Sequence, residues 1–457
     1  QILRSIISSN KTPYYPIGFV DDNPMKRGVI IHGLEVLGKI SDIPRVSADN
    51  NIKQMIIALP SADNKIIKTA VEFGRKAKIR KIKIAPPLSE IIRGRVSFKN
   101  LKDIDAEDLL GRKQVVIDTK QIENFIKNKA VLITGAAGSI GSELSRQVAK
   151  FKPSILFLLD QDETGIFHIS KELENDFADL DIESFVADIT DKEKIIGIFK
   201  KARPKIVFHA AAYKHVPLME ANPDEAVKNN IFGTKNLAEA SLEFFAEKFI
   251  FISTDKAVNP TSVMGATKRL GEMICQSANQ KNGAKFISVR FGNVLNSRGS
   301  VIPTFREQIK RGGPVQVTHP DMKRYFMLIS EACLLVMQAS AMGQGGEVFV
   351  LDMGKPIKIL DLAKEMIKLS GFEPDKDIAI VFTNPRPGEK LFEEILTAEE
   401  GTIATRNEKI FMAKLSETDP QVLQDRLKKL EIAASENNKE QIENIFKEAL
   451  PYYNNIK

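Results

Sequence analysis

Short apolar runs alternate with longer amphipathic segments from residue 130 onward. The runs fall at residues 130–134, 155–160, 183–187, 206–211, 249–253 and 286–290. Runs of this length between helix-sized segments are typical of strands in a parallel sheet. The alternation predicts an α/β fold with a doubly wound parallel sheet, whose ligands bind beyond the carboxyl ends of the strands.

The pattern changes on both sides of this region. Residues 1–115 predict a small N-terminal α/β domain, with a strand at 55–58, a helix at 64–77 and a strand at 79–85 before Pro86 and Pro87. Residues 116–129 predict a polar connector with a short helix. We expect a catalytic domain at 130–457, with its core at about 130–290 and a smaller, less regular lobe mainly from 291 on. The spacing beyond Ser416 predicts two surface helices.

Composition narrows the class of protein. The chain has 43% hydrophobic and 27% charged residues, and no apolar run approaches the roughly 18 residues of a membrane span. Residues 1–128 carry 23 Lys and Arg against 14 Asp and Glu. This excess is larger than the net charge of +7 of the whole chain, so the positive charge comes from this part and the rest is slightly negative. The cluster from Arg75 to Lys83 indicates a solvated basic face or attraction to an anionic membrane or acidic ligand. No nucleic-acid motif accompanies it, so we expect no nucleic acid partner.

The sequence offers no metal site. Cys275 and Cys333 each lie in an apolar helical pattern, which favours buried, reduced thiols. The five histidines form no pair at metal-binding spacing.

A glycine-rich turn follows the strand at 130–134. Gly135, Gly138 and Gly141 are spaced three apart, with Ser139 and Ile140 opening the next helix. The first glycine permits a tight turn, the second lets backbone amides approach a pyrophosphate, and the third lets the helix pack closely on the sheet. This context predicts a dinucleotide site and makes 130–290 the nucleotide-binding core.

Residues after the next strands favour NAD over NADP. Asp160 ends the strand at 155–160, where a carboxylate accepts both ribose hydroxyl groups and repels a 2′-phosphate. Asp188 and Ile189 follow the next strand, at a position suited to the adenine. The small side chains of Ala210, Ala211 and Ala212 leave room for the cofactor.

The segment that follows the strand at 249–253 carries the candidate catalytic residues Thr254, Asp255, Lys256, Met264 and Lys268. Together with the glycine motif, it resembles the extended short-chain dehydrogenase/reductase superfamily. More narrowly, it resembles the membrane-associated UDP-N-acetylglucosamine 4,6-dehydratases of bacterial glycan and capsule synthesis, above all the bacillosamine-pathway type of protein N-glycosylation. The similarity covers essentially the whole chain.

One residue departs from the superfamily pattern. Met264 stands where the superfamily has the tyrosine of Tyr-x-x-x-Lys. A thioether has no titratable proton, so Met264 cannot take the proton of the sugar 4-hydroxyl group. In this departure the chain resembles the bacillosamine-type dehydratases, in which methionine is tolerated at this position.

The resemblance implies a role for each remaining residue. Asp255 would protonate the leaving 6-hydroxyl group and Lys256 would take the C5 proton. Because neighbours in an extended segment point to opposite sides, we expect their side chains to diverge. We also expect burial or Lys268 to lower the pKa of Lys256. We hypothesise that Thr254 relays the 4-hydroxyl proton toward Lys268, which would also hold the nicotinamide ribose.

Substrate contacts follow from the same resemblance. It places Asn293 on the nucleotide diphosphate and Val301 and Pro303 against the uracil of a UDP-sugar. Arg324 and Arg386 suit phosphates, because guanidinium binds them bidentately. The remaining candidates are Lys214 and His215, which follow the fourth strand, and Glu389, three residues after Arg386.

Two rival functions remain open. A nucleotide-sugar 4-epimerase needs the same cofactor and sugar contacts but no acid and base aimed at C6 and C5. A non-catalytic NAD-binding sensor or scaffold would fit the missing tyrosine. By resemblance, we expect a homo-oligomer on the cytoplasmic side of the bacterial inner membrane. A segment upstream of Gln1 would make the membrane contact, and this chain would be a soluble fragment.

Overall fold

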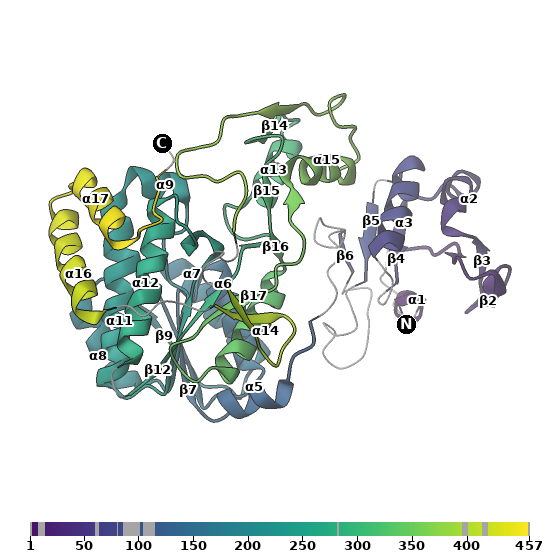
Figure 1. The fold of residues 1–457 in the computed structure, drawn as a ribbon. Helices are drawn as coiled ribbons and strands as arrows, with labels where there is room; N and C mark the ends of the chain where they lie inside the picture. The colour runs from purple at the N-terminus through teal and green to yellow at the C-terminus, as the bar shows by residue number, and fades with distance from the viewer. Residues whose placement is uncertain are drawn as a thin grey trace. The chain divides into compact units, whose positions relative to one another are not determined.

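The computed structural model describes residues 2–7, 14–59, 64–79, 81–85, 101–103, 115–280, 283–394, 401–413 and 419–455. The chain forms two compact units (Figure 1). The first comprises Gln1–Lys113, Thr304–Val317 and Asp361–Val381, and the second comprises Gln114–Pro303, Thr318–Leu360 and Phe382–Lys457.

The N-terminal part of the first unit has two small sheets. One has the order β1 (Phe19–Val20), β3 (Leu34–Gly38), β2 (Ile30–Ile31), and the other has β4 (Gln54–Ile57), β5 (Lys81–Ile84), β6 (Lys102–Asp103). Its helices and short turns are α1 (Ile2–Ile7), η1 (Pro24–Lys26), η2 (Ile40–Asp42), α2 (Ile43–Asn50) and α3 (Asn64–Lys76). The predicted strand, helix and strand are confirmed as β4, α3 and β5. Pro86 and Pro87 lie outside the described residues.

The rest of the first unit comes from later in the chain. It contains most of α13 (Val301–Lys310), most of α15 (Ile359–Leu369), and the two-stranded sheet of β14 (Val315–Val317) and β19 (Ile380–Phe382).

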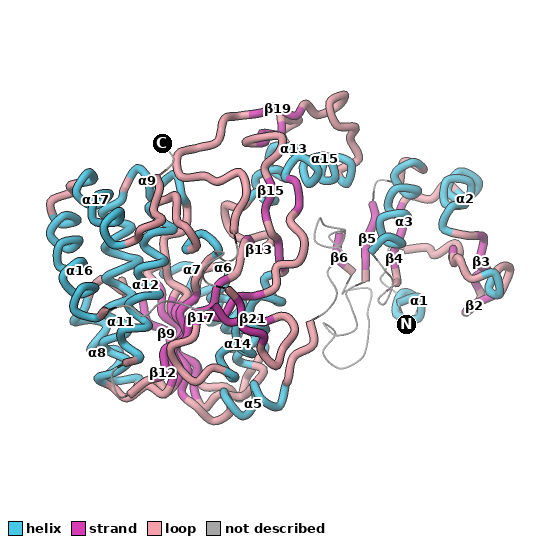
Figure 2. The backbone as a smooth tube through the Cα atoms, viewed as in Figure 1, coloured by secondary structure: helices cyan, strands magenta, loops and turns pink. Residues whose placement is uncertain are grey.

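A nine-stranded sheet forms the centre of the second unit (Figure 2). Its order is β20 (Thr402–Ala404), β21 (Ile410–Ala413), β17 (Val348–Leu351), β12 (Lys285–Arg290), β11 (Lys248–Ile252), β10 (Ile206–His209), β7 (Ala130–Thr134), β8 (Ile155–Asp160), β9 (Ile182–Val186). Neighbouring strands from β17 to β9 are parallel. In contrast, β21 runs antiparallel to β17, and β20 runs antiparallel to β21. The order reverses at β7, next to β10, which is where such sheets bind ligands.

Alternating side chains of the strands build a core on each face of this sheet. In β11, Phe249 and Phe251 face one core and Ile250 faces the other. The first core is covered by α8 (Lys192–Ala202), α11 (Thr234–Glu243) and α12 (Val263–Asn279), with α16 (Pro420–Ser435) and α17 (Lys439–Ala449) packed on them. The second is covered by α5 (Thr119–Ile126), α6 (Ser139–Ala149), α7 (Glu163–Asp176) and α14 (Ile329–Met342).

Shorter elements complete the second unit. They are α9 (Val216–Ala221), α10 (Pro223–Ala226), the π-helix η5 (Val227–Gly233) and the turn η6 (Asp255–Ala257). Two strand pairs lie outside the main sheet: β13 (Asn293–Val294) with β16 (Phe326–Met327), and β15 (Lys323–Arg324) with β18 (Ile357–Lys358).

The six predicted strands of the doubly wound sheet are confirmed to within one or two residues. The expected lobe boundary differs, because β17, β21 and β20 lie beyond residue 291 and yet extend the main sheet. The predicted tail helices are α16 and α17, each with one apolar face buried against the core. No helix among the described residues is long and apolar enough to span a membrane.

Candidate active site

The glycine turn after β7 leaves no space for side chains. Gly135 has a φ of +68°, and a Cβ there would lie 2.6 Å from the backbone nitrogen of Ala211. A Cβ on Gly141 would lie 2.0 Å from the carbonyl oxygen of Gly135. Gly138 is the N-cap of α6, so no side chain covers the first-turn amides that include Ser139 and Ile140. Bare amides at a helix N-terminus are an anion site.

The other predicted cofactor residues lie at the same edge of the sheet. The Asp160 carboxylate accepts hydrogen bonds from the backbone nitrogens of Ala137 and Asp162, both at 3.0 Å. Asp188 is exposed and follows β9, while Ile189 is buried. The half-buried residues Ala210, Ala211 and Ala212 follow β10, beside the glycine turn. The structure therefore brings the four loops of the predicted dinucleotide site together.

Thr254, Asp255 and Lys256 follow β11 at this edge. Thr254 caps η6, accepting a hydrogen bond from the Lys256 backbone nitrogen at 3.3 Å. The 3-10 turn brings the next two side chains together, with Lys256 Nζ 3.0 Å from Asp255 Oδ1. The prediction that they diverge is wrong, because the segment is not extended at these residues.

This ion pair is buried. Asp255 is 1% exposed, and its Oδ1 also accepts a hydrogen bond from the Thr254 hydroxyl at 2.8 Å. Lys256 Nζ donates to Asn293 Oδ1 at 3.2 Å. Asp255 Oδ2 has no hydrogen-bond partner among the described residues. A buried carboxylate oxygen without a donor is costly and available to a ligand hydroxyl group.

The electrostatic surroundings of Lys256 correct a second expectation. Burial lowers its pKa, but the carboxylates of Asp255 and Glu393 outweigh burial, so the pKa is raised. Glu393 Oε1 lies 3.6 Å from Lys256 Nζ. The sequence reasoning missed Glu393, which lies four residues beyond Glu389 in a segment rich in charged residues. Only its burial distinguishes it from its neighbours.

Lys268 and Met264 lie in the first half of α12 and are both buried. Lys268 Nζ lies 3.9 Å from the centre of the Phe251 ring. Burial lowers the pKa of Lys268 to about 7, although the nearby Cys275 and Glu272 oppose the shift. A lysine with this pKa can exchange a proton near neutral pH.

Behind the catalytic segment lies a buried ion pair that the sequence analysis did not identify. Glu272 of α12 accepts two hydrogen bonds from the guanidinium of Arg290, each at 2.7 Å, and both side chains are fully buried. It also accepts from the Ser253 hydroxyl at 2.6 Å and from Arg269 at 2.9 Å. This network connects β11 and β12 to α12, directly before Thr254.

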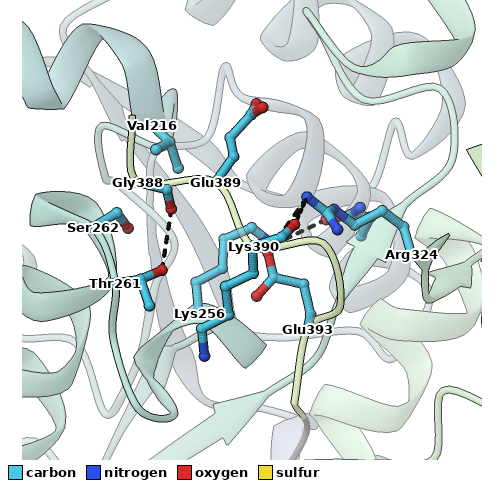
Figure 3. Close-up of a pocket in the computed structure, with 10 residues that line it drawn as sticks. Val216, Lys256, Thr261, Ser262, Arg324, Gly388, Glu389, Lys390 and Glu393 are labelled. Carbon is cyan, nitrogen blue, oxygen red and sulfur yellow. Dashed lines mark hydrogen bonds and ion pairs between the residues drawn. The ribbon is translucent and has the colours of Figure 1, made fainter. Parts of the chain in front are cut away.

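A cavity of about 180 Å³ lies beside Lys256 (Figure 3). Asn293, Arg324 and Glu389, three of the predicted substrate residues, line it. The Arg324 guanidinium donates to the carbonyl oxygens of Lys323, Lys390 and Leu391, at 2.9, 2.7 and 3.1 Å. Its donors are therefore largely used within the protein.

The other substrate candidates lie elsewhere. Lys214 Nζ donates to the Arg298 carbonyl oxygen at 2.9 Å, and the His215 ring lies against Gly299. The same loop reaches α6, where the Arg298 backbone nitrogen donates to Ser139 Oγ at 3.0 Å.

Three further candidates do not line the cavity beside Lys256. Val301 and Pro303 lie in the first turn of α13. Arg386 is exposed. The structure thus gathers Asn293, Arg324 and Glu389 beside the ion pair and leaves these three outside its cavity.

Comparison with known proteins places this geometry in a family. Residues 131–415 match the polysaccharide biosynthesis protein family, and residues 1–86 match the CoA-binding domain family. The capsular polysaccharide biosynthesis protein CapD of Staphylococcus aureus is 47% identical over 91% of this chain and 69% of its own length.

Two further relatives match a smaller share of the chain. A UDP-N-acetylglucosamine 4,6-dehydratase (inverting) of Campylobacter jejuni is 33% identical over 60% of this chain and 80% of its own. A UDP-glucose 4-epimerase of Rickettsia prowazekii is 33% identical over 60% of this chain and 79% of its own. The recognised superfamily is confirmed: the chain belongs to the polysaccharide biosynthesis protein family of extended short-chain dehydrogenase/reductase enzymes, which includes nucleotide-sugar dehydratases and epimerases.

Proposed function

We propose that this protein is an NAD-dependent UDP-N-acetylglucosamine 4,6-dehydratase of bacterial glycan synthesis. The observation that carries the proposal is the buried Asp255–Lys256 pair at the carboxyl end of β11. A 4-epimerase has no use for an acid and a base beside C6 and C5. The equal identity to a dehydratase and an epimerase does not choose between them, so this chemistry does.

The proposed NAD site rests on the cradle formed by Gly135, Gly138 and Gly141, in which Cβ atoms on Gly135 and Gly141 would meet backbone at 2.6 and 2.0 Å. The α6 amides would hold the pyrophosphate and Asp160 the adenosine ribose. NAD held there would supply the acceptor for the hydride of sugar C4 and the donor of that hydride to C6.

Asp255 and Lys256 would act as a coupled pair in the elimination. Transfer of one proton across their 3.0 Å contact turns the carboxylate and ammonium into an acid and an amine. The amine takes the proton from C5, and the acid gives its proton to the departing 6-hydroxyl group, which leaves as water. This step regenerates the ammonium and the carboxylate. The raised pKa of Lys256 means that the pair rests in this charged form before and after the step.

Lys268 would accept the 4-hydroxyl proton, through Thr254 or a water. Its pKa of about 7 suits that transfer, and Met264 cannot carry it out. Lys256 returns its proton to C5 when the hydride reaches C6. The 4-hydroxyl proton replaces the one that Asp255 gave to water, so the proton count balances.

The remaining assignments belong to the same proposal. Asn293 would position the diphosphate and the Lys256 amine together, and Val301 and Pro303 would face the uracil. Lys214 and His215 would lie toward the sugar, and Arg324, Arg386 and Glu389 toward the rest of the nucleotide. The proposed enzyme works as a homo-oligomer on the cytoplasmic side of the bacterial inner membrane.

Incubation of the protein with UDP-N-acetylglucosamine and NAD, followed by mass spectrometry of the nucleotide sugar, tests the proposal. A dehydratase yields a product lighter by one water. An epimerase yields a product of unchanged mass that separates chromatographically, and a sensor leaves the substrate intact. Asp255→Asn and Lys256→Met should each lower the rate by roughly 10²–10⁴-fold, while NAD still binds. Retention of the parent rate by either variant contradicts the assigned roles.

A further inference from the structure

Glu393 is a buried carboxylate to which the proposed reaction gives no proton. It is 8% exposed and lines the cavity beside Lys256. Its Oε1 lies 3.6 Å from Lys256 Nζ. It reaches the amine from a segment that is far from η6 along the chain. A buried carboxylate requires a counter-charge, and the Lys256 ammonium supplies it.

Arg324 fixes the segment that carries Glu393. Its guanidinium donates to the carbonyl oxygens of Lys390 and Leu391, and its Nη2 lies 3.9 Å from Glu393 Oε1. Figure 3 shows Glu393 between Lys256 and Arg324. The backbone of this segment is therefore tied to β15, and the carboxylate has little freedom to leave Lys256.

We propose that Glu393 is a positioning residue, which acts with Asp255 and Asn293 to hold the Lys256 amine in place and to keep it protonated until turnover. This inference rests on the proposed function, in which Lys256 is the base at C5. The amine is held from three directions, by Asp255 Oδ1 at 3.0 Å, Asn293 Oδ1 at 3.2 Å and Glu393 Oε1 at 3.6 Å.

The two carboxylates differ in what happens to them during the reaction. Asp255 becomes neutral when it takes the proton of Lys256, and its attraction for the amine then falls. Glu393 keeps its charge, so it continues to stabilise the ammonium form of Lys256 and favours return of the proton. The charged groups that act on Lys256 are Asp255 from η6, Glu393 from the late segment and Arg324 from β15.

Lys390 and Glu389 line the same cavity with opposite charges. Burial and Arg324 lower the pKa of Lys256, whereas Asp255 and Glu393 raise it. Removing the charge of Glu393 should lower this pKa, because Asp255 would then be the one carboxylate of the two that still raises it.

Lysine acylation measured against pH tests the inference without relying on turnover. The full chain is treated with a trace of acetic anhydride, and mass spectrometry gives the pH at which Lys256 is half-reactive. Glu393→Gln should lower this midpoint by about 1 pH unit or more, because an opposite charge within about 4–6 Å shifts a pKa by 1–3 units. The alkaline limb of kcat/KM should move in the same direction, because loss of the Lys256 proton leaves the pair without its acid.

Matched variants separate charge from structure. Glu394→Gln removes the same charge from the next residue, whose carboxylate contacts Asn259 and Lys390 instead, and should leave the midpoint unchanged. Glu393→Asp keeps the charge and should retain a midpoint within about 0.5 pH unit of the parent.

An unchanged midpoint in Glu393→Gln, or an equal fall in Glu394→Gln, would overturn the inference. If Glu393→Gln fails to fold, a Glu393→Asp midpoint more than 1 pH unit below the parent overturns it, and one close to the parent supports it. A lowered midpoint in Glu393→Gln in a protein that dehydrates no sugar would uphold the electrostatic role of Glu393 and reject the proposed function.

Discussion

Replacing Glu272 with Gln should destabilise the second unit severely. Glu272 and Arg290 are both fully buried and share two hydrogen bonds of 2.7 Å. Gln keeps the shape of the side chain but removes its charge. The Arg290 guanidinium would then remain in the core without a full counter-charge, which is the costly half of a broken buried pair.

The buried Glu272–Arg290 pair sets the size of the loss. Arg290, Arg269 and Ser253 outweigh burial and hold the pKa of Glu272 at about 2, against an ordinary value of 4.5. At 1.36 kcal/mol per pKa unit this difference corresponds to about 3 kcal/mol. Breaking a buried ion pair by removing one partner typically costs about 3–5 kcal/mol. We therefore expect a loss of about 3–5 kcal/mol in the free energy of unfolding at pH 7.

Urea unfolding of parent and variant measures this loss. Because the chain has no Trp, the transition is best followed by far-UV circular dichroism. The folded pKa of Glu272 is depressed, so its contribution is complete above about pH 4.5 and is lost as pH falls toward 2. The difference between the two proteins should shrink over that window.

Glu174→Gln, which breaks the exposed pair with Lys171, is the matched control and should cost less than about 1 kcal/mol. A loss below about 1 kcal/mol for Glu272→Gln would refute the reasoning.

Three further substitutions test the site. Gly141→Ala should weaken NAD binding at least tenfold by calorimetry, because its Cβ would lie 2.0 Å from the Gly135 oxygen; affinity within twofold of the parent would count against the cradle. Met264→Leu should keep turnover within about threefold, since a buried side chain of similar volume moves no proton; a loss beyond tenfold would give the thioether a role. Formation of NADH in a single turnover should rise with pH through about 7 in the parent, as Lys268 becomes neutral. Lys268→Arg should abolish that rise because guanidinium stays charged, and a parent profile flat from pH 6 to 8 would exclude Lys268 as the acceptor.

The pattern of apolar and glycine positions was enough to predict the central strands and the turn after the first of them. The strands from β7 to β12 and the glycine turn follow from short apolar runs and from backbone positions that admit no side chain. The strands β21 and β20 were not predicted, because their place in the sheet depends on the pairing of β21 with β17 and of β20 with β21 rather than on their own composition.

In the candidate site, too, local sequence predicted the residue types, and contacts between distant segments were missed. The sequence singled out Asp255 and Lys256, because their types and their place after a strand suit the proposed chemistry. It did not give their mutual contact, which depends on a 3-10 turn capped by Thr254. The direction of the Lys256 pKa shift was also missed, because the turn brings the Asp255 carboxylate onto the amine and Glu393 reaches it from a segment far along the chain.

The buried Glu272–Arg290 pair could not be predicted from the sequence. Each residue is an ordinary charged side chain in a helix or strand that also carries other charged residues. Only the packing of α12 against β12 shows that the two charges neutralise each other.

UDP-N-acetylglucosamine that carries deuterium at C4 offers the most direct test of the central claim. If one active site removes hydride from C4, expels water through Asp255 and Lys256 and returns the hydride, the 4-keto product will be lighter by one water and will carry the deuterium at C6 by NMR. A 4-epimer with deuterium still at C4, or a dehydrated product with its deuterium lost to solvent, would contradict the account.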